Sequence, residues 1–153
     1  MRFKILHIYS ILFSLTLLCS VNVQAQNVDT AQKAFTWNAN DSDLKWNPCP
    51  DFMPESCRIA FIQGDPAEPN ADVFFKMEGK TSVTQHWHHS AERMVLISGE
   101  MQVQYESQDP VELNSGDYAY GPPKKPHTAS CISDKPCILF IAFEKPVDAF
   151  STR

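Results

Sequence analysis

From residue 58 onward, short apolar runs alternate with turn-forming residues, and this pattern predicts short β-strands. Gly, Pro, Asn, Asp and Ser fill the gaps between the runs. After residue 58, no apolar period of 3.6 residues persists over about ten positions, so the sequence predicts no helix there. The expected strands are residues 58–63, 72–77, 82–89, 92–98, 101–105, 110–113, 118–120, 127–132 and 137–144. Many short strands separated by frequent turns are typical of an all-β sandwich or a small barrel.

The run at residues 92–98 is apolar on both faces of the expected strand. Glu92, Met94 and Leu96 share one face, which we expect to line the interior of a barrel. The opposite face carries Val95 and Ile97, and a strand that is apolar on both sides needs a cover on each. We expect a second sheet, the N-terminal arm or a dimer partner to provide the second cover.

The first 25 residues have the pattern of a signal peptide. Arg2 and Lys4 precede an uncharged, mostly apolar stretch at residues 5–18, and Val23-Gln24-Ala25 resembles a signal-peptidase site. The stretch is shorter than the roughly 20 residues that a membrane-spanning helix requires, and polar residues interrupt it. We therefore expect cleavage after Ala25 and a periplasmic or secreted protein that has no membrane association once the signal is removed.

The rest of the chain divides into an irregular N-terminal arm at residues 26–57 and a strand-rich domain at residues 58–150. The 153 residues are 43% hydrophobic, which suffices for one core and one domain. The net charge of −5 is unfavourable for a nucleic-acid partner, which requires a basic face, and for an anionic membrane surface. The expected partners are therefore small molecules and a second copy of the chain.

Four cysteines follow the expected cleavage site, and an exported chain favours disulfides. Three pairings are open, of which the simplest is local: Cys49 with Cys57, and Cys131 with Cys137. Residues 133–136 resemble a hairpin turn that would place Cys131 opposite Cys137. A structural zinc site, which the lack of a CxxC pair disfavours, and free buried thiols are the alternatives.

The histidines form a pattern typical of a metal site. His86 and His88 are two residues apart, so a β-strand directs both side chains to one face, and Glu92 is in phase with them if one strand continues unbroken. His127 begins another expected strand and supplies a fourth ligand, whereas His89 points away. Three imidazoles and one carboxylate suit one divalent transition metal: Fe, Mn, Ni, Co, Cu or Zn. An exposed polar patch is the alternative interpretation.

These residues resemble the first motif of the cupin superfamily, which consists of a glycine, HxH, a glutamate and a second glycine at fixed spacings. His86, His88, Glu92 and Gly99 match this motif in full. Gly79 lies one residue further from His86 than the motif requires.

The residues 116–131 resemble the second cupin motif, in which Gly116, Pro122 and His127 match in register. Lys124 stands where the motif has a glycine, and Cys131 stands where it has an asparagine. The first departure bears on a turn and not on a ligand, and the second leaves Cys131 available for a disulfide.

The resemblance implies an all-β fold, a single cupin jelly-roll barrel whose interior holds a metal bound by His86, His88, Glu92 and His127. It also implies a homodimer formed through a strand edge. It favours a quercetinase-like enzyme, a metal-dependent dioxygenase that acts on a small organic substrate with adjacent oxygen atoms. The alternative is a non-catalytic metal- or ligand-binding envelope protein, a sensor or a carrier, because a fold alone does not specify a function.

Met94 and Leu96 share the interior phase of Glu92 and are therefore candidates for the substrate pocket. Four aromatic residues are added without such a phase argument, and plain core packing is the alternative for each. Phe140 and Phe143 are three residues apart, so a regular strand would not point both inward. These candidates are Met94, Leu96, Tyr118, Tyr120, Phe140 and Phe143. The sequence identifies no catalytic residue.

Overall fold

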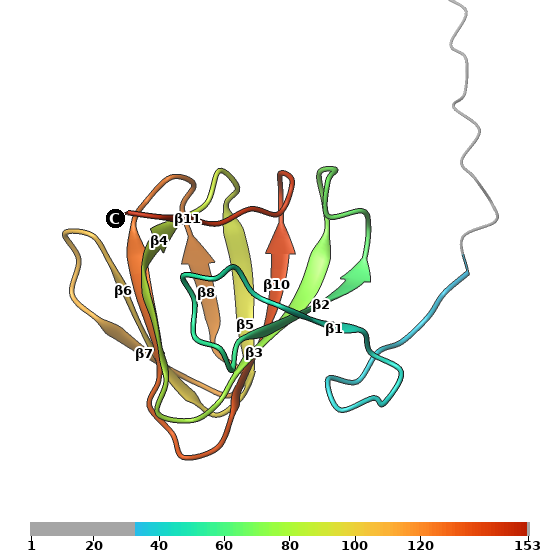
Figure 1. Cartoon of the computed structure of the whole chain (residues 1–153), viewed down its shortest axis with the longest axis horizontal. Helices are drawn as coiled ribbons and strands as arrows, with labels where there is room; N and C mark the ends of the chain where they lie inside the picture. Colours follow the sequence, from blue (N-terminus) through green and yellow to red (C-terminus); the bar gives the residue numbers. More distant parts are fainter. Residues whose placement is uncertain (1–32, 153) are drawn as a thin grey trace, which may run out of the picture. The chain divides into compact units, whose positions relative to one another are not determined.

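The described part of the chain forms eleven strands in two antiparallel sheets that face each other across a common interior (Figure 1). The computed structural model describes residues 33–152, and a compact unit begins at Thr36. The six-stranded sheet has the order β1 (Trp46–Pro48), β2 (Arg58–Gln63), β3 (Asp72–Met77), β10 (Cys137–Phe143), β5 (Glu92–Ser98) and β8 (Tyr118–Gly121). The five-stranded sheet has the order β11 (Phe150–Ser151), β4 (Ser82–Trp87), β9 (His127–Cys131), β6 (Glu100–Tyr105) and β7 (Val111–Asn114).

From β3 onward the chain passes repeatedly from one sheet to the other. β3 is followed by β4 in the second sheet, β5 returns to the first, and β8, β9 and β10 continue the alternation. This connectivity is that of a jelly roll, which confirms the expected all-β barrel. Within residues 33–152 no helix is long and apolar enough to cross a membrane. The expected signal peptide at residues 1–25 lies outside the described residues.

The alternation of the sequence located most strand boundaries closely. β2, β3 and β5 have the expected bounds, and the other expected strands differ by one or two residues at their ends. β1 and β11 were not expected, since strands of three and two residues are too short to show a period. Their partners stabilise them, because β1 pairs with β2 and β11 pairs with β4.

The expected hairpin at residues 133–136 is wrong, although the disulfide that it suggested is present. β9 pairs with β4 and β6 in the five-stranded sheet, whereas β10 pairs with β3 and β5 in the six-stranded sheet. The connection therefore crosses between the sheets. The bond from Cys131 to Cys137 joins the two sheets at this end of the barrel. The second disulfide joins Cys49 to Cys57, so both local pairings form.

The end of the barrel near the Cys131–Cys137 disulfide is filled by apolar side chains. Leu96 in β5 and Met101 in β6 are fully buried there, from opposite sheets. Across the first sheet, Leu139 of β10 pairs with Leu96 and Ile141 pairs with Met94, so these side chains share the interior face. Leu96 was expected in the pocket, but it belongs to this core because it lies deeper along β5 than Met94 does.

The outer face of the six-stranded sheet is covered in part by the segment that precedes β2. Leu44, Ala60 and Phe74 form a second buried cluster, against which Trp46 and Phe140 pack. Part of the expected arm thus supplies a cover, and Phe140 contributes to this outer layer and not to the interior. The cover does not reach the far end of β5, where Ile97 is 40% exposed.

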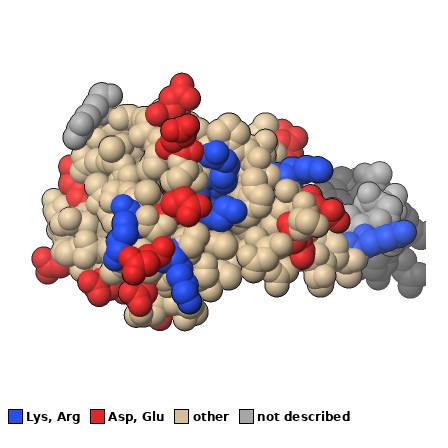
Figure 2. Space-filling view, turned by 60° about the horizontal axis from the view of Figure 1, so that its bottom comes forward, with Lys and Arg blue, Asp and Glu red and all other residues tan. Residues whose placement is uncertain are grey.

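Charged side chains of both signs lie interspersed on the face of the molecule shown in Figure 2, where blue Lys and Arg groups neighbour red Asp and Glu groups. The described residues on this face form no continuous basic area.

Candidate metal centre

Three buried histidines converge in the interior at the end of the barrel opposite the apolar core. His86 lies in β4 and is paired directly with His127 at the start of β9, and His88 follows just beyond the end of β4. Their ring centroids are 4.2 to 5.4 Å apart, and one ligand atom from each lies within 4.8 Å of the other two. All three side chains are 5–7% exposed, so the pattern is not the exposed polar patch of the alternative interpretation.

Backbone carbonyls orient each imidazole. The Nδ1 atom of His86 lies 2.8 Å from the carbonyl oxygen of Thr84, that of His127 lies 3.1 Å from the oxygen of Lys125, and that of His88 bonds to the oxygen of Asp148. Because a carbonyl oxygen only accepts, each Nδ1 donates its proton and each Nε2 keeps a free lone pair. This is the usual second-shell arrangement of metal-binding histidines.

Glu92 completes the group from the opposite sheet. Its Oε1 is 3.5 Å from Nε2 of His88 and its Oε2 is 3.6 Å from Nε2 of His127. The expectation that one strand continues from His86 to Glu92 is wrong, since β4 ends at Trp87 and the chain crosses to β5 in the other sheet. Glu92 faces the histidines because it begins β5 on the interior face of the barrel.

Burial sets the protonation of these groups. Burial, and then the charge of a neighbouring histidine, lower the pKa of His86 to about 4 and that of His127 to about 3. Burial also raises the pKa of the Glu92 carboxyl, against the attraction of His88. The Nε2 atom of His88 is buried and has no hydrogen-bond partner among the described residues. Neutral imidazoles, a buried carboxyl and an unpartnered nitrogen fit one divalent first-row metal ion.

Gly121 and Tyr105 support Glu92 from the side. Gly121 in β8 is paired directly with Glu92, and a Cβ atom there would lie 3.1 Å from Glu92 Oε2 and collide with the Tyr105 hydroxyl. This hydroxyl is buried without a hydrogen-bond partner in the described structure. Burial, and then the charge of Glu92, raise the pKa of Tyr105, so the phenol keeps its proton.

The C-terminal segment holds the His88 side of the site. Besides the carbonyl bond to His88, Asp148 accepts hydrogen bonds from the His89 backbone at 2.9 Å and from the His89 ring at 2.7 Å. Phe150 stacks on Trp87 with ring centroids 4.7 Å apart. His89 thus points away from the cavity, as expected, but it fixes the residue that orients His88.

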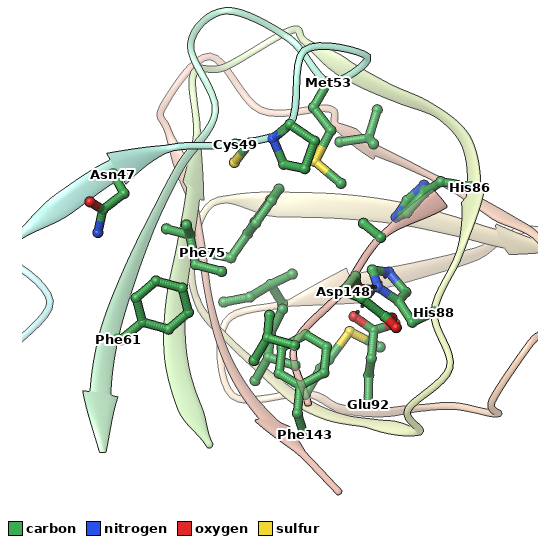
Figure 3. A pocket seen from close by; sticks show the side chains of 18 of the residues that line it. Asn47, Cys49, Met53, Phe61, Phe75, His86, His88, Glu92, Phe143 and Asp148 are labelled. Atoms are coloured by element: carbon green, nitrogen blue, oxygen red, sulfur yellow. Dashed lines mark hydrogen bonds and ion pairs between the residues drawn. The ribbon is translucent and has the colours of Figure 1, made fainter. Parts of the chain in front are cut away.

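A cavity of about 380 Å³ opens from the four candidate ligands. His86, His88 and Glu92 lie on one side of it and Phe61 and Phe75 on the other (Figure 3). Its roof is the segment from Asn47 to Met53, whose residue Cys49 is bonded to Cys57. The volume is within the range of small-molecule sites.

The structure places two of the six pocket candidates, Met94 and Phe143, at the cavity. It places Tyr118 and Tyr120 on the outer face of β8, 59% and 52% exposed, and Phe140 and Leu96 as described above. The register explains the two tyrosines, because Tyr118 pairs with Val95 and Tyr120 pairs with Arg93, which face outward.

Several residues at the site were not identified from the sequence. Phe75 and Tyr105 share the interior phase of Val73 and Val103 in their own strands, so the alternation contained a signal for both. The contribution of Asp148 to His88 is a backbone carbonyl, which has no signature in the sequence.

A family model described as a cupin domain matches residues 73–143, so this part of the chain is similar to a cupin domain. Solved structures share its fold. The DMSP lyase DddQ from Ruegeria pomeroyi DSS-3 has a TM-score of 0.63 at 16% identity, over 71% of this chain and 61% of that one. Oxalate decarboxylase from Lactobacillus farciminis has a TM-score of 0.59 at 21% identity, over 72% and 34%.

A third structure, of Bacillus subtilis oxalate decarboxylase with Mn(II) centres, has a TM-score of 0.57 at 19% identity, over 65% of this chain and 29% of that one. The match thus covers less than two thirds of each of these longer chains. A search of curated proteins found no match.

Proposed function

We propose that this protein is a metal-dependent cupin enzyme, specifically a dioxygenase that acts on a small organic substrate. The observation that carries the proposal is the convergence of His86, His88, Glu92 and His127 at the wall of an otherwise apolar cavity. Enzyme sites typically combine such a cavity with a few convergent polar groups. The manganese of one similar structure adds support for a metal cofactor.

The four side chains would hold one divalent first-row metal ion, which supplies Lewis-acid or redox chemistry when bound. The carbonyls of Thr84, Lys125 and Asp148 fix the imidazole rings before the ion arrives. The surrounding apolar walls exclude water from the reacting groups.

Metal content and oxygen uptake test the proposal together. We expect the protein isolated from its own compartment to contain about one transition-metal ion per chain. We also expect it to consume oxygen with a catechol, a flavonol or a dione. His127→Ala should lose most of the metal and all oxygen uptake, because it removes a ligand. The control is Gln104→Ala, which replaces an exposed residue of β6 outside the cavity and should keep both.

The outcomes separate the dioxygenase from its alternative. A protein that contains the metal but consumes no oxygen with any of these compounds would be a binding protein, such as a sensor or carrier. Unchanged metal content in both His86→Ala and His127→Ala would refute the ligand assignment itself.

We also propose that the protein acts in the periplasm or outside the cell. The two disulfides support this location, because disulfides persist in oxidising compartments. N-terminal sequencing of the exported protein should begin at Gln26. Recovery of the full-length, reduced chain from the cytoplasm would contradict the proposal.

A further inference from the structure

The walls of the cavity differ from its metal-binding side in polarity. Beyond the candidate ligands they are formed mainly by aliphatic, aromatic and methionine side chains. No described residue that lines the cavity is a lysine or an arginine. Its two acidic residues are Glu92 and Asp148, and Asp148 is paired with His89. The cavity thus contains no described side chain that would neutralise an anionic group away from the metal centre.

The apolar side of the cavity is suited to a flat ring. Phe61 and Phe75 lie opposite His86 and His88, and Met53 lies above the space between them (Figure 3). Aromatic rings and thioether sulfurs bind aromatic groups favourably. A volume of about 380 Å³ corresponds to about a dozen water molecules at roughly 30 Å³ each, which is space for two fused rings.

We infer that the ligand of this cavity is an uncharged aromatic molecule with two adjacent oxygen atoms at one edge. The oxygens would face the candidate ligands, which rests on the proposed function, and the ring would lie against Phe61 and Phe75. A carboxylate that reached the apolar wall would be buried without a partner, at a cost of several kcal/mol. A ligand that carries a carboxylate against this wall is therefore disfavoured.

A matched pair of probes tests this inference by binding alone. The probes are 2,3-dihydroxynaphthalene, which is neutral at pH 7, and naphthalene-2,3-dicarboxylate, which has the same rings and two charges. Calorimetric titration uses both the metal-free and the zinc-loaded protein, since zinc undergoes no redox change. We expect the diol to bind at least about tenfold more tightly than the dicarboxylate to the metal-free protein, whose cavity contains no described lysine or arginine to pair with the charges. Zinc should narrow this preference, because the ion attracts carboxylates.

Variants at one position separate the walls from the metal site. Phe61 lines the cavity but is 39% exposed, so its replacement should leave the fold intact. Phe61→Ala should weaken diol binding about tenfold through the lost apolar contact. Phe61→Arg should shift the preference toward the dicarboxylate by about tenfold, because it supplies the missing cation. Tyr118→Ala, an exposed aromatic residue outside the cavity, is the control and should change neither probe.

The outcome of this binding test can be distinguished from the outcome of the test for dioxygenase activity. Equal or tighter binding of the dicarboxylate to the metal-free protein, or no binding of the diol, would overturn the inference even if oxygen uptake were observed with another compound. Conversely, a protein that binds the diol with the stated preference but consumes no oxygen would retain this ligand class and lose the dioxygenase activity.

Discussion

Glu92 holds a carboxyl group that burial shields from water in the metal-free protein. Because its pKa is raised in the folded chain, folding favours the protonated form, and the resulting stabilisation is complete below the ordinary carboxyl pKa of 4.5. As the pH rises above 4.5, the unfolded chain ionises first and this stabilisation is lost at up to about 1.4 kcal/mol per pH unit. A neutral side chain at this position would avoid that cost.

We therefore expect metal-free Glu92→Gln to match the stability of the metal-free wild type near pH 4 and to be more stable than it at pH 7. The same variant, purified without metal removal, should contain less metal than the wild type. Urea unfolding of both metal-free proteins from pH 4 to pH 8 measures the difference in their free energies of unfolding. The histidines are the same in both proteins, so their contribution cancels in this difference. Glu112→Gln, an exposed glutamate of β7, is the control and should show no such trend. A Glu92→Gln variant that is less stable at pH 7 would show that the carboxylate is already satisfied without metal.

Gly121 provides a second test, because the space that its missing side chain leaves is taken by Tyr105 and Glu92. We expect Gly121→Ala to lower metal affinity about tenfold or more, since its methyl group collides with the Tyr105 hydroxyl and displaces the neighbouring carboxylate. The double variant Gly121→Ala/Tyr105→Phe should recover much of the affinity, because it removes the colliding oxygen. Competition with a metal chelator measures the affinity of the wild type and both variants, and failure of the second change to restore binding would rule out this contact as the cause.

At the scale of single residues, the resemblance of His86, His88, Glu92 and His127 to the cupin motifs was enough to predict four candidate ligands that the structure brings together, because each is a side chain with a distinctive chemistry. Lys124 agrees with the cupin motif in its backbone conformation and not in its residue type. It stands where the motif has a glycine, yet its φ of 60° is the left-handed conformation that glycine adopts most readily. The turn before His127 is thus kept although the residue type is not. The carbonyl of Asp148 had no comparable signal.

The two disulfides tie different elements, so their removal should have different effects. Cys131–Cys137 joins the sheets at the apolar end, whereas Cys49 belongs to the roof of the cavity. We expect Cys131→Ala/Cys137→Ala to lower stability by about 2 kcal/mol and to leave diol affinity unchanged. Cys49→Ala/Cys57→Ala should weaken diol binding as well, because it frees the roof. Thermal unfolding and calorimetric titration distinguish the two, and an identical loss of binding in both would contradict the assigned locations.

At the scale of elements, alternation predicts where a strand lies but not which strand it joins. The bounds of β2, β3 and β5 follow from their own residues. The path from Cys131 to Cys137 and the crossing from His86 to Glu92 both depend on which sheet receives the next strand. That choice is made by contacts between residues far apart in the sequence, and the two wrong expectations arose at these connections.

At the scale of the whole molecule, the apolar core and the candidate binding site lie at opposite ends of the barrel. One end is closed by the buried residues around Leu96 and Met101, and the other end holds the histidines, the cavity and its roof. The covering segment before β2 protects the outer face of β2, β3 and β10. It leaves the far edge of the six-stranded sheet uncovered, where β8 is the terminal strand.

This uncovered edge is where we expect a second copy of the chain to bind. Tyr118, Tyr120 and Ile97 are 59%, 52% and 40% exposed on the same outer face, and an exposed strand edge with large apolar side chains favours association. Ile97→Glu/Tyr120→Glu should convert a dimer into a monomer in light scattering, because each partner would bury the new charges. Val111→Glu, an equally exposed residue on the edge strand β7 of the other sheet, is the control and should remain dimeric. A wild-type protein with the mass of one chain would refute the dimer, and a dimer lost only in the Val111 variant would move the interface to β7.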